Sequence, residues 1–143
     1  MKSSLQTLSR IQKFNIDEQR KLLVEQQEKE ERLINEINKL TTQFEQEKEF
    51  ARNHANYGDF GLYAKRYIAK RDDLETSLAA VQARIEEIRD TISAMFKEQK
   101  TFEIVDKNRK KAEQKELSDK EQKMLDEIGT NAYIKHQRND KGD

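Results

Sequence analysis

Cysteine and proline are both absent from this 143-residue chain, and it contains only four glycines. The lack of cysteine excludes disulfides and thiolate metal sites. The lack of proline allows long helices to run unbroken, because proline removes a backbone donor and clashes with the preceding turn. An excess of charge of one sign is also missing, since 28 basic residues balance 28 acidic ones. Binding driven by net attraction to nucleic acid or anionic lipid is therefore not expected.

Long hydrophobic runs are missing as well. No stretch approaches the roughly 18 apolar residues that a membrane-spanning helix needs, and the start, Met1 to Gln6, lacks the apolar run of a secretory signal. We therefore expect a cytoplasmic protein whose partners are proteins. Charged residues make up 39% of the chain, against about 25% in average globular domains, which favours long exposed helices over a compact core.

A seven-residue repeat of apolar residues is the main positive signal. Together with a companion position four residues on, it makes the 3-4 spacing of a left-handed coiled coil and argues against disorder. The first position is occupied by Phe60, Tyr67, Leu74, Val81, Ile88, Met95 and Phe102, and the second by Ala64, Arg71, Leu78, Ile85, Ile92 and Gln99.

A weaker repeat precedes the only clear helix breaker, residues 53–61. Its first position holds Ile16, Leu23, Glu30, Ile37, Phe44 and Ala51, and its second Gln12, Gln19, Gln26, Leu33, Leu40 and Glu47. Leu5, Leu8 and Ile11 lie off this phase, so looser pairing is expected near the start. The pattern predicts an all-α fold, a hairpin of two long antiparallel helices forming a coiled coil.

The turn can be placed from its residue types. Gly58 can adopt the positive φ that ends a helix, and Asp59 can cap the next one. The predicted hairpin spans residues 1–130, with arm one at about 5–56, a turn at about 57–61 and arm two at about 62–128. Gly129 predicts the end of the second helix, and the composition of residues 130–143 predicts a polar flexible tail. Folding the chain at residue 58 predicts that Ile88 lies near Glu28, and that the second helix overhangs the first.

An enzyme is not expected, and neither are cofactors or metals. The only histidines, His54 and His136, have Ala51 and Tyr133 three residues before them, so the Glu-x-x-His pattern of di-iron bundles is missing. Gly58 is not followed by the Gly-Lys-Ser/Thr run of a phosphate-binding loop. The carboxylates are spread over a solvated helix face.

Two C-terminal runs carry a family resemblance. Residues 110–115 read Lys-Lys-Ala-Glu-Gln-Lys, and residues 121–128 read Glu-Gln-Lys-Met-Leu-Asp-Glu-Ile. This ending, with the chain length and central turn, resembles the flagellar export protein family FliJ over about residues 5 to 130. The resemblance implies a non-enzymatic stalk of the type III export apparatus that supports motility. Its implied partners are the hexameric export ATPase, the membrane export-gate protein and, as a further expectation, export chaperones. The resemblance also implies a cytoplasmic location with peripheral association at the membrane export gate.

Two surfaces are candidate binding sites. The overhang and the resemblance together predict that the ATPase contacts Arg10, Lys13, Arg109, Lys110, Lys111, Met124, Leu125 and Ile128. The aromatic residues at the turn either pack the tip or dock on the export gate; they are Tyr57, Phe60, Tyr63 and Tyr67. The coiled-coil pattern also fits an adaptor or chaperone hairpin, an injectisome stalk, or a dimer that runs straight through residue 58.

Overall fold

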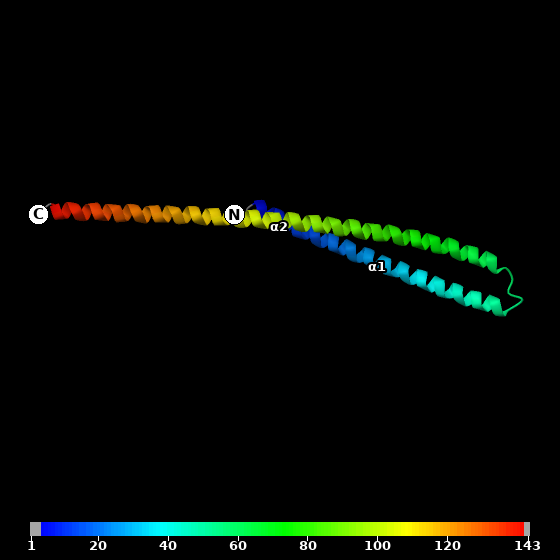
Figure 1. Cartoon of the computed structure of the whole chain (residues 1–143). Helices are drawn as coiled ribbons and strands as arrows, with labels where there is room; N and C mark the ends of the chain where they lie inside the picture. The colour runs from blue at the N-terminus through cyan, green and yellow to red at the C-terminus, as the bar shows by residue number, and fades with distance from the viewer. Residues whose placement is uncertain (1–3, 142–143) are drawn as a thin grey trace. The chain divides into compact units, whose positions relative to one another are not determined.

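The structure is a computed structural model that describes residues 4–141, and side chains up to residue 139. It contains two α-helices, α1 (Ser4–Asn53) and α2 (Phe60–Lys141), joined by a linker of residues 54–59 (Figure 1). The described residues contain no strand. The all-α fold predicted from the heptads is therefore confirmed.

The chain forms two compact units. One is Arg10–Glu98, and the other combines residues up to Ser9 with residues from Gln99 onward. In Arg10–Glu98, α1 and α2 run antiparallel: the Gln12 amide donates to the Met95 carbonyl at 3.3 Å, and the Phe44 ring stacks on Tyr67 at 4.0 Å between centroids. The predicted helical hairpin is confirmed in this unit.

Both predicted seams are the buried faces of the helices. In α2, every residue of the two repeats from Phe60 to Phe102 is buried or half-buried, and in α1 the same holds from Gln12 to Ala51. The spacing of seven continues along α1 without a break, so the looser phase expected near its start is not seen within Arg10–Glu98. Leu8 and Ile11 are exposed, as expected for residues off the seam, whereas Leu5, seven residues before Gln12, is half-buried and does not lie off the phase. The most deeply buried side chain is Ile88, which is 1% exposed.

The turn forms by the predicted chemistry but in a different place. Gly58 has a φ of 98°, which suits a residue without a Cβ, and the Asp59 carboxylate accepts a hydrogen bond from the Leu62 amide at 3.2 Å. However, α1 ends at Asn53 and α2 begins at Phe60. The linker therefore starts three residues before the predicted turn and ends two residues before it, and α2 begins directly after the Asp59 cap.

The predicted register of the two helices is wrong. A fold at residue 58 would place residue 72 opposite Phe44 and residue 104 opposite Gln12, yet Phe44 stacks on Tyr67 and Gln12 bonds to Met95 and Glu98. Symmetric folding about one glycine assumes a minimal turn. The six-residue linker and the packing of its aromatic side chains set a different offset.

The predicted helix end at Gly129 is also wrong, because α2 continues to Lys141. Among the described glycines only Gly58 has a positive φ, so Gly129 keeps a right-handed helical conformation. A glycine inside a helix costs only about 1 kcal/mol relative to alanine, and no proline follows to end the helix. Residues 142 and 143 of the predicted tail lie outside the described residues.

Candidate functional site

The four aromatic residues predicted at the tip lie in one packed cluster. Tyr67 is buried, while Tyr57, Phe60 and Tyr63 are half-buried. The Phe44 ring is central, with its centroid 4.0 Å from that of Tyr67, 5.6 Å from Phe60 and 6.2 Å from Tyr63. Offset and tilted aromatic pairs at such distances stabilise a core beyond their area. The arrangement shows these side chains packing the tip, and docking through them stays a proposal.

Tyr57 ties the linker to α1. Its hydroxyl donates a hydrogen bond to the Glu47 carboxylate at 2.8 Å. That hydrogen bond is the main reason why the pKa of the Tyr57 phenol is raised, since ionisation would remove the donor and place a second negative charge beside Glu47. The bond thus fixes the linker against the last turns of α1.

Two apolar side chains at the tip remain open to solvent, and the sequence patterns did not single them out. Phe50 is 51% exposed and Leu62 is 49% exposed. Phe50 stacks on His54 at 3.8 Å, and the His54 Nδ1 lies 2.8 Å from the Phe50 carbonyl oxygen in the last turn of α1. Both residues lie off the heptad seams, and that position was the available signal that they face outward.

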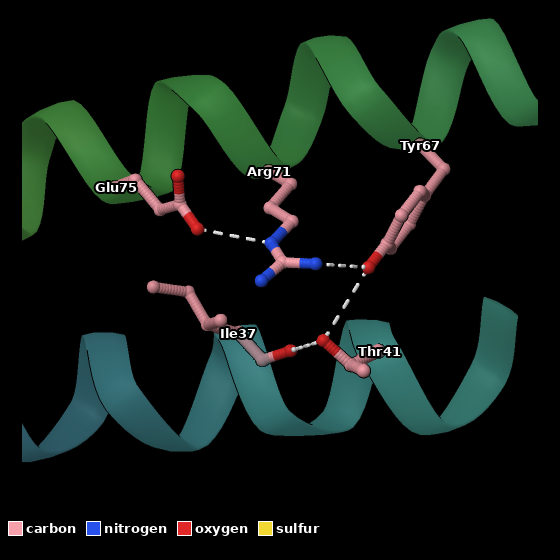
Figure 2. A network of polar contacts seen from close by, with 5 residues as sticks. All are labelled: Ile37, Thr41, Tyr67, Arg71 and Glu75. Atoms are coloured by element: carbon pink, nitrogen blue, oxygen red, sulfur yellow. Dashed lines mark hydrogen bonds and ion pairs between the residues drawn. The ribbon is translucent and has the colours of Figure 1, made fainter. Parts of the chain in front are cut away.

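A polar layer crosses the seam next to the aromatic cluster (Figure 2). The Arg71 guanidinium donates to the Tyr67 hydroxyl at 2.9 Å and to the Glu75 carboxylate at 2.9 Å. On the facing helix, the Thr41 hydroxyl lies 3.5 Å from the Tyr67 hydroxyl and donates to the Ile37 carbonyl at 2.9 Å. A charged side chain thus occupies a seam position where it has polar partners on its own helix.

The C-terminal part of α2 has no helix packed against it in its own unit. Residues 107–139 are all exposed. Within this stretch the predicted contact residues Met124, Leu125 and Ile128 are 63%, 62% and 58% exposed. Further exposed apolar side chains, which the sequence analysis did not select, are Leu117, Tyr133 and Ile134.

The predicted basic residues differ in how they are paired. Arg109 lies 3.5 Å from Asp106 and 3.7 Å from Glu113, and Lys110 lies 3.2 Å from Asp106. Asp106 is half-buried, while Arg109, Lys110 and Glu113 are exposed. Pairs at i,i+3 and i,i+4 stabilise a helix by only about 0.2 to 0.5 kcal/mol each, so a partner could replace them at little cost. Lys111 is exposed on the same unit.

The other two predicted contacts, Arg10 and Lys13, are exposed on α1 in the unit Arg10–Glu98. They lie about one turn apart on the helix, so their side chains can be reached from the same side. The described residues contain no group of three or more His, Cys, Asp or Glu side chains arranged to hold a metal. No helix in the described part of the chain is long and apolar enough to cross a membrane.

Comparison with known proteins adds the family. Neither the curated proteins nor the solved structures give a match. The family described as "Flagellar FliJ protein" matches residues 1–138, which is nearly the whole chain. With the helical hairpin and the exposed end of α2 in place, the chain belongs to the FliJ family of flagellar proteins.

Proposed function

We propose that this chain is a non-enzymatic stalk that binds the hexameric export ATPase, promotes assembly of its ring, and couples it to the membrane export gate. Membership of the FliJ family makes the chain a component of the flagellar export apparatus. The ATPase contact and the coupling are the proposal. Both parts of the proposal rest on the apolar and basic side chains of α1 and α2 that remain exposed to solvent.

The observation that carries the proposal is the distribution of apolar side chains around the end of α2. Successive residues of a helix are turned by about 100°. Met124 and Ile128 therefore share a face, Leu125 is turned about a quarter of the way round, and Tyr133, nine residues after Met124, points to the opposite side; all four are exposed. A helix that is apolar on several sides is usually surrounded by protein. A ring that encloses this segment would satisfy that requirement better than one flat surface.

The basic residues would serve a different purpose in the same contact. Arg10, Lys13, Arg109, Lys110 and Lys111 are solvent-exposed, and exposed charges are screened within about 8 Å at physiological salt. They would accelerate encounter and orient the helix on an acidic surface. The apolar side chains would supply most of the binding energy, at about 1.5 to 3 kcal/mol for each that becomes fully buried.

The gate contact is assigned to the tip because it lies at the far end of α1 from Arg10 and Lys13 within Arg10–Glu98. Tyr57, Phe60, Tyr63 and Tyr67 give this end a packed aromatic base, and exposed Phe50 and Leu62 supply the apolar surface. Export chaperones would be further partners of the same exposed helices.

The test is a triple variant, Met124→Gln, Leu125→Gln and Ile128→Gln. Glutamine is a good helix former, so α2 should keep its helical circular dichroism while ATPase binding and stimulation are lost. The matched control is Leu22→Gln, Val24→Gln and Ile34→Gln, which changes three exposed apolar residues of α1. Full ATPase binding by the first variant would refute the C-terminal contact, as would equal loss of binding by both.

A further inference from the structure

The two helices of Arg10–Glu98 can be matched in more than one register. A coiled-coil seam repeats every seven residues, so sliding one helix past the other by seven residues returns seam residues to seam residues. Apolar periodicity alone therefore does not choose between registers one heptad apart. The choice depends on polar groups in the seam and on the linker.

In the observed register, the seam pairs polar with apolar residues at several levels. The Phe44–Tyr67 stack sets the level. A step of four residues along each helix places Leu40 opposite Arg71, and a step of two heptads places Glu30 opposite Val81. A half-buried charge against an aliphatic side chain loses hydration without gaining a partner across the seam. Arg71 is compensated by Tyr67 and Glu75 of its own helix.

A shift of one heptad changes these matches. If Leu74 takes the place of Tyr67 opposite Phe44, then Arg71 comes opposite Glu47, which is half-buried on the α1 seam. A carboxylate and a guanidinium facing each other across a seam can form a charge-assisted pair. The same shift places Val81 opposite Ile37, which joins two half-buried aliphatic side chains, and it moves Glu30 from Val81 to Ile88. The gain of the shifted register therefore lies in the new partner of Arg71.

At the far end of the unit, the shift would break the hydrogen bonds from Gln12 to Met95 and Glu98. Near the tip, it would also break contacts of Phe44, Thr41 and Glu47. They are the stack of Phe44 on Tyr67, the approach of the Thr41 and Tyr67 hydroxyls at 3.5 Å, and the hydrogen bond from Tyr57 to Glu47 at 2.8 Å. The hydrogen bond from Tyr57 engages the Glu47 carboxylate, which is the group that would face Arg71 in the shifted register. The linker is long enough for both registers, because six residues can span about 20 Å when extended.

We propose that the hairpin has a second register, one heptad away, in which Arg71 pairs with Glu47, and that the layer of Thr41, Tyr67 and Tyr57 holds the observed register. The shift displaces the helices along each other by about 10 Å, given a rise of about 1.5 Å per residue. Register shifts of helices occur on the microsecond to millisecond scale. Such a displacement would couple a change at the tip to a movement at the opposite end of the unit Arg10–Glu98.

Disulfide trapping in the isolated chain tests whether the second register is populated. Because the chain contains no natural cysteine, only the introduced pair can form a disulfide. The pair Ile37→Cys and Leu74→Cys reports the observed register, and Ile37→Cys with Val81→Cys reports the shifted one. The control, Ile37→Cys with Ala80→Cys, uses an exposed position next to Val81. Dilute protein and mass analysis separate intramolecular from intermolecular products.

A minor state at about 0.1 to 10% should make the Val81 pair form about 10 to 1,000 times more slowly than the Leu74 pair, yet faster than the Ala80 control. Tyr67→Phe and Tyr57→Phe should each raise the rate of the Val81 pair, because each removes a hydroxyl contact that exists only in the observed register and leaves Arg71 and Glu47 in place. A Val81 pair that forms no faster than the control would overturn the second register. Rates unchanged by both substitutions would overturn the proposed lock. No partner protein is needed, so the result is independent of the ATPase proposal.

Discussion

Ile88 offers a direct measure of how much the seam stabilises the hairpin. Its side chain is 1% exposed, the lowest value in the described part of the chain, and it lies on the α2 seam. Replacement by alanine removes most of a side chain whose burial contributes about 1.5 to 3 kcal/mol, and the space left behind adds a further cost. Ile88→Ala should therefore destabilise the hairpin by about 2 to 4 kcal/mol.

The matched control is Ile68→Ala. Ile68 lies on the same helix and in the same unit, but it is 54% exposed. Both changes replace isoleucine with the better helix former alanine, so the gain in helix propensity, a few tenths of a kcal/mol, is common to both and cancels in the difference. Ile68→Ala should be neutral or slightly stabilising.

Urea denaturation followed by circular dichroism at dilute concentration measures both changes. A lower midpoint with an unchanged slope for Ile88→Ala would report lost stability without a change in the unfolded state. The reasoning fails if Ile88→Ala and Ile68→Ala shift the midpoint equally. It also fails if a tenfold dilution shifts the midpoint of the parent chain, because a monomeric hairpin has no concentration dependence.

Three further predictions concern the linker. Asp59→Ala should cost about 1 kcal/mol because the Leu62 amide loses its cap, with Asp59→Asn retaining most of the stability in the same urea assay. Gly58→Ala should cost about 1 kcal/mol through strain at a φ of 98°; an unchanged midpoint would contradict this. Because the pKa of Tyr57 is raised, its hydrogen bond stabilises the tip fully below the unfolded-state pKa and is lost as pH rises through the folded-state pKa. Ultraviolet titration should show late ionisation that Tyr57→Phe removes, and Glu47→Gln should lower the pKa of Tyr57 toward its usual value.

The buried faces were predictable residue by residue because their cause is local. A spacing of three and four is present in the chain before it folds, and any helix built from it carries one apolar stripe. This is why even polar members such as Gln99 and Arg71 were assigned to the seam and are found there. The cap at Asp59 and the positive φ of Gly58 were equally accessible, since each depends on one residue type at one turn.

The outward-facing residues were harder to select. Met124, Leu125 and Ile128 stood out as an apolar group without a partner, and they are exposed. The sequence does not predict Tyr133 and Ile134 as contacts, because Gly129 predicts a helix end before them, whereas α2 continues to Lys141. The aromatic residues of the tip were selected by residue type, yet they are not all accessible. Tyr67 is of a type that is common in docking surfaces, but contacts with α1 bury it.

The sequence by itself determined the helical class, the two seams and the cap, because each follows from residue type and spacing along one chain. Only the tertiary structure decided the register. A heptad pattern is unchanged by a shift of seven residues, so the offset is set by contacts between helices and linker, above all the Phe44–Tyr67 stack and the bond from Tyr57 to Glu47. Those contacts join residues from different elements, and no periodicity within one element encodes them.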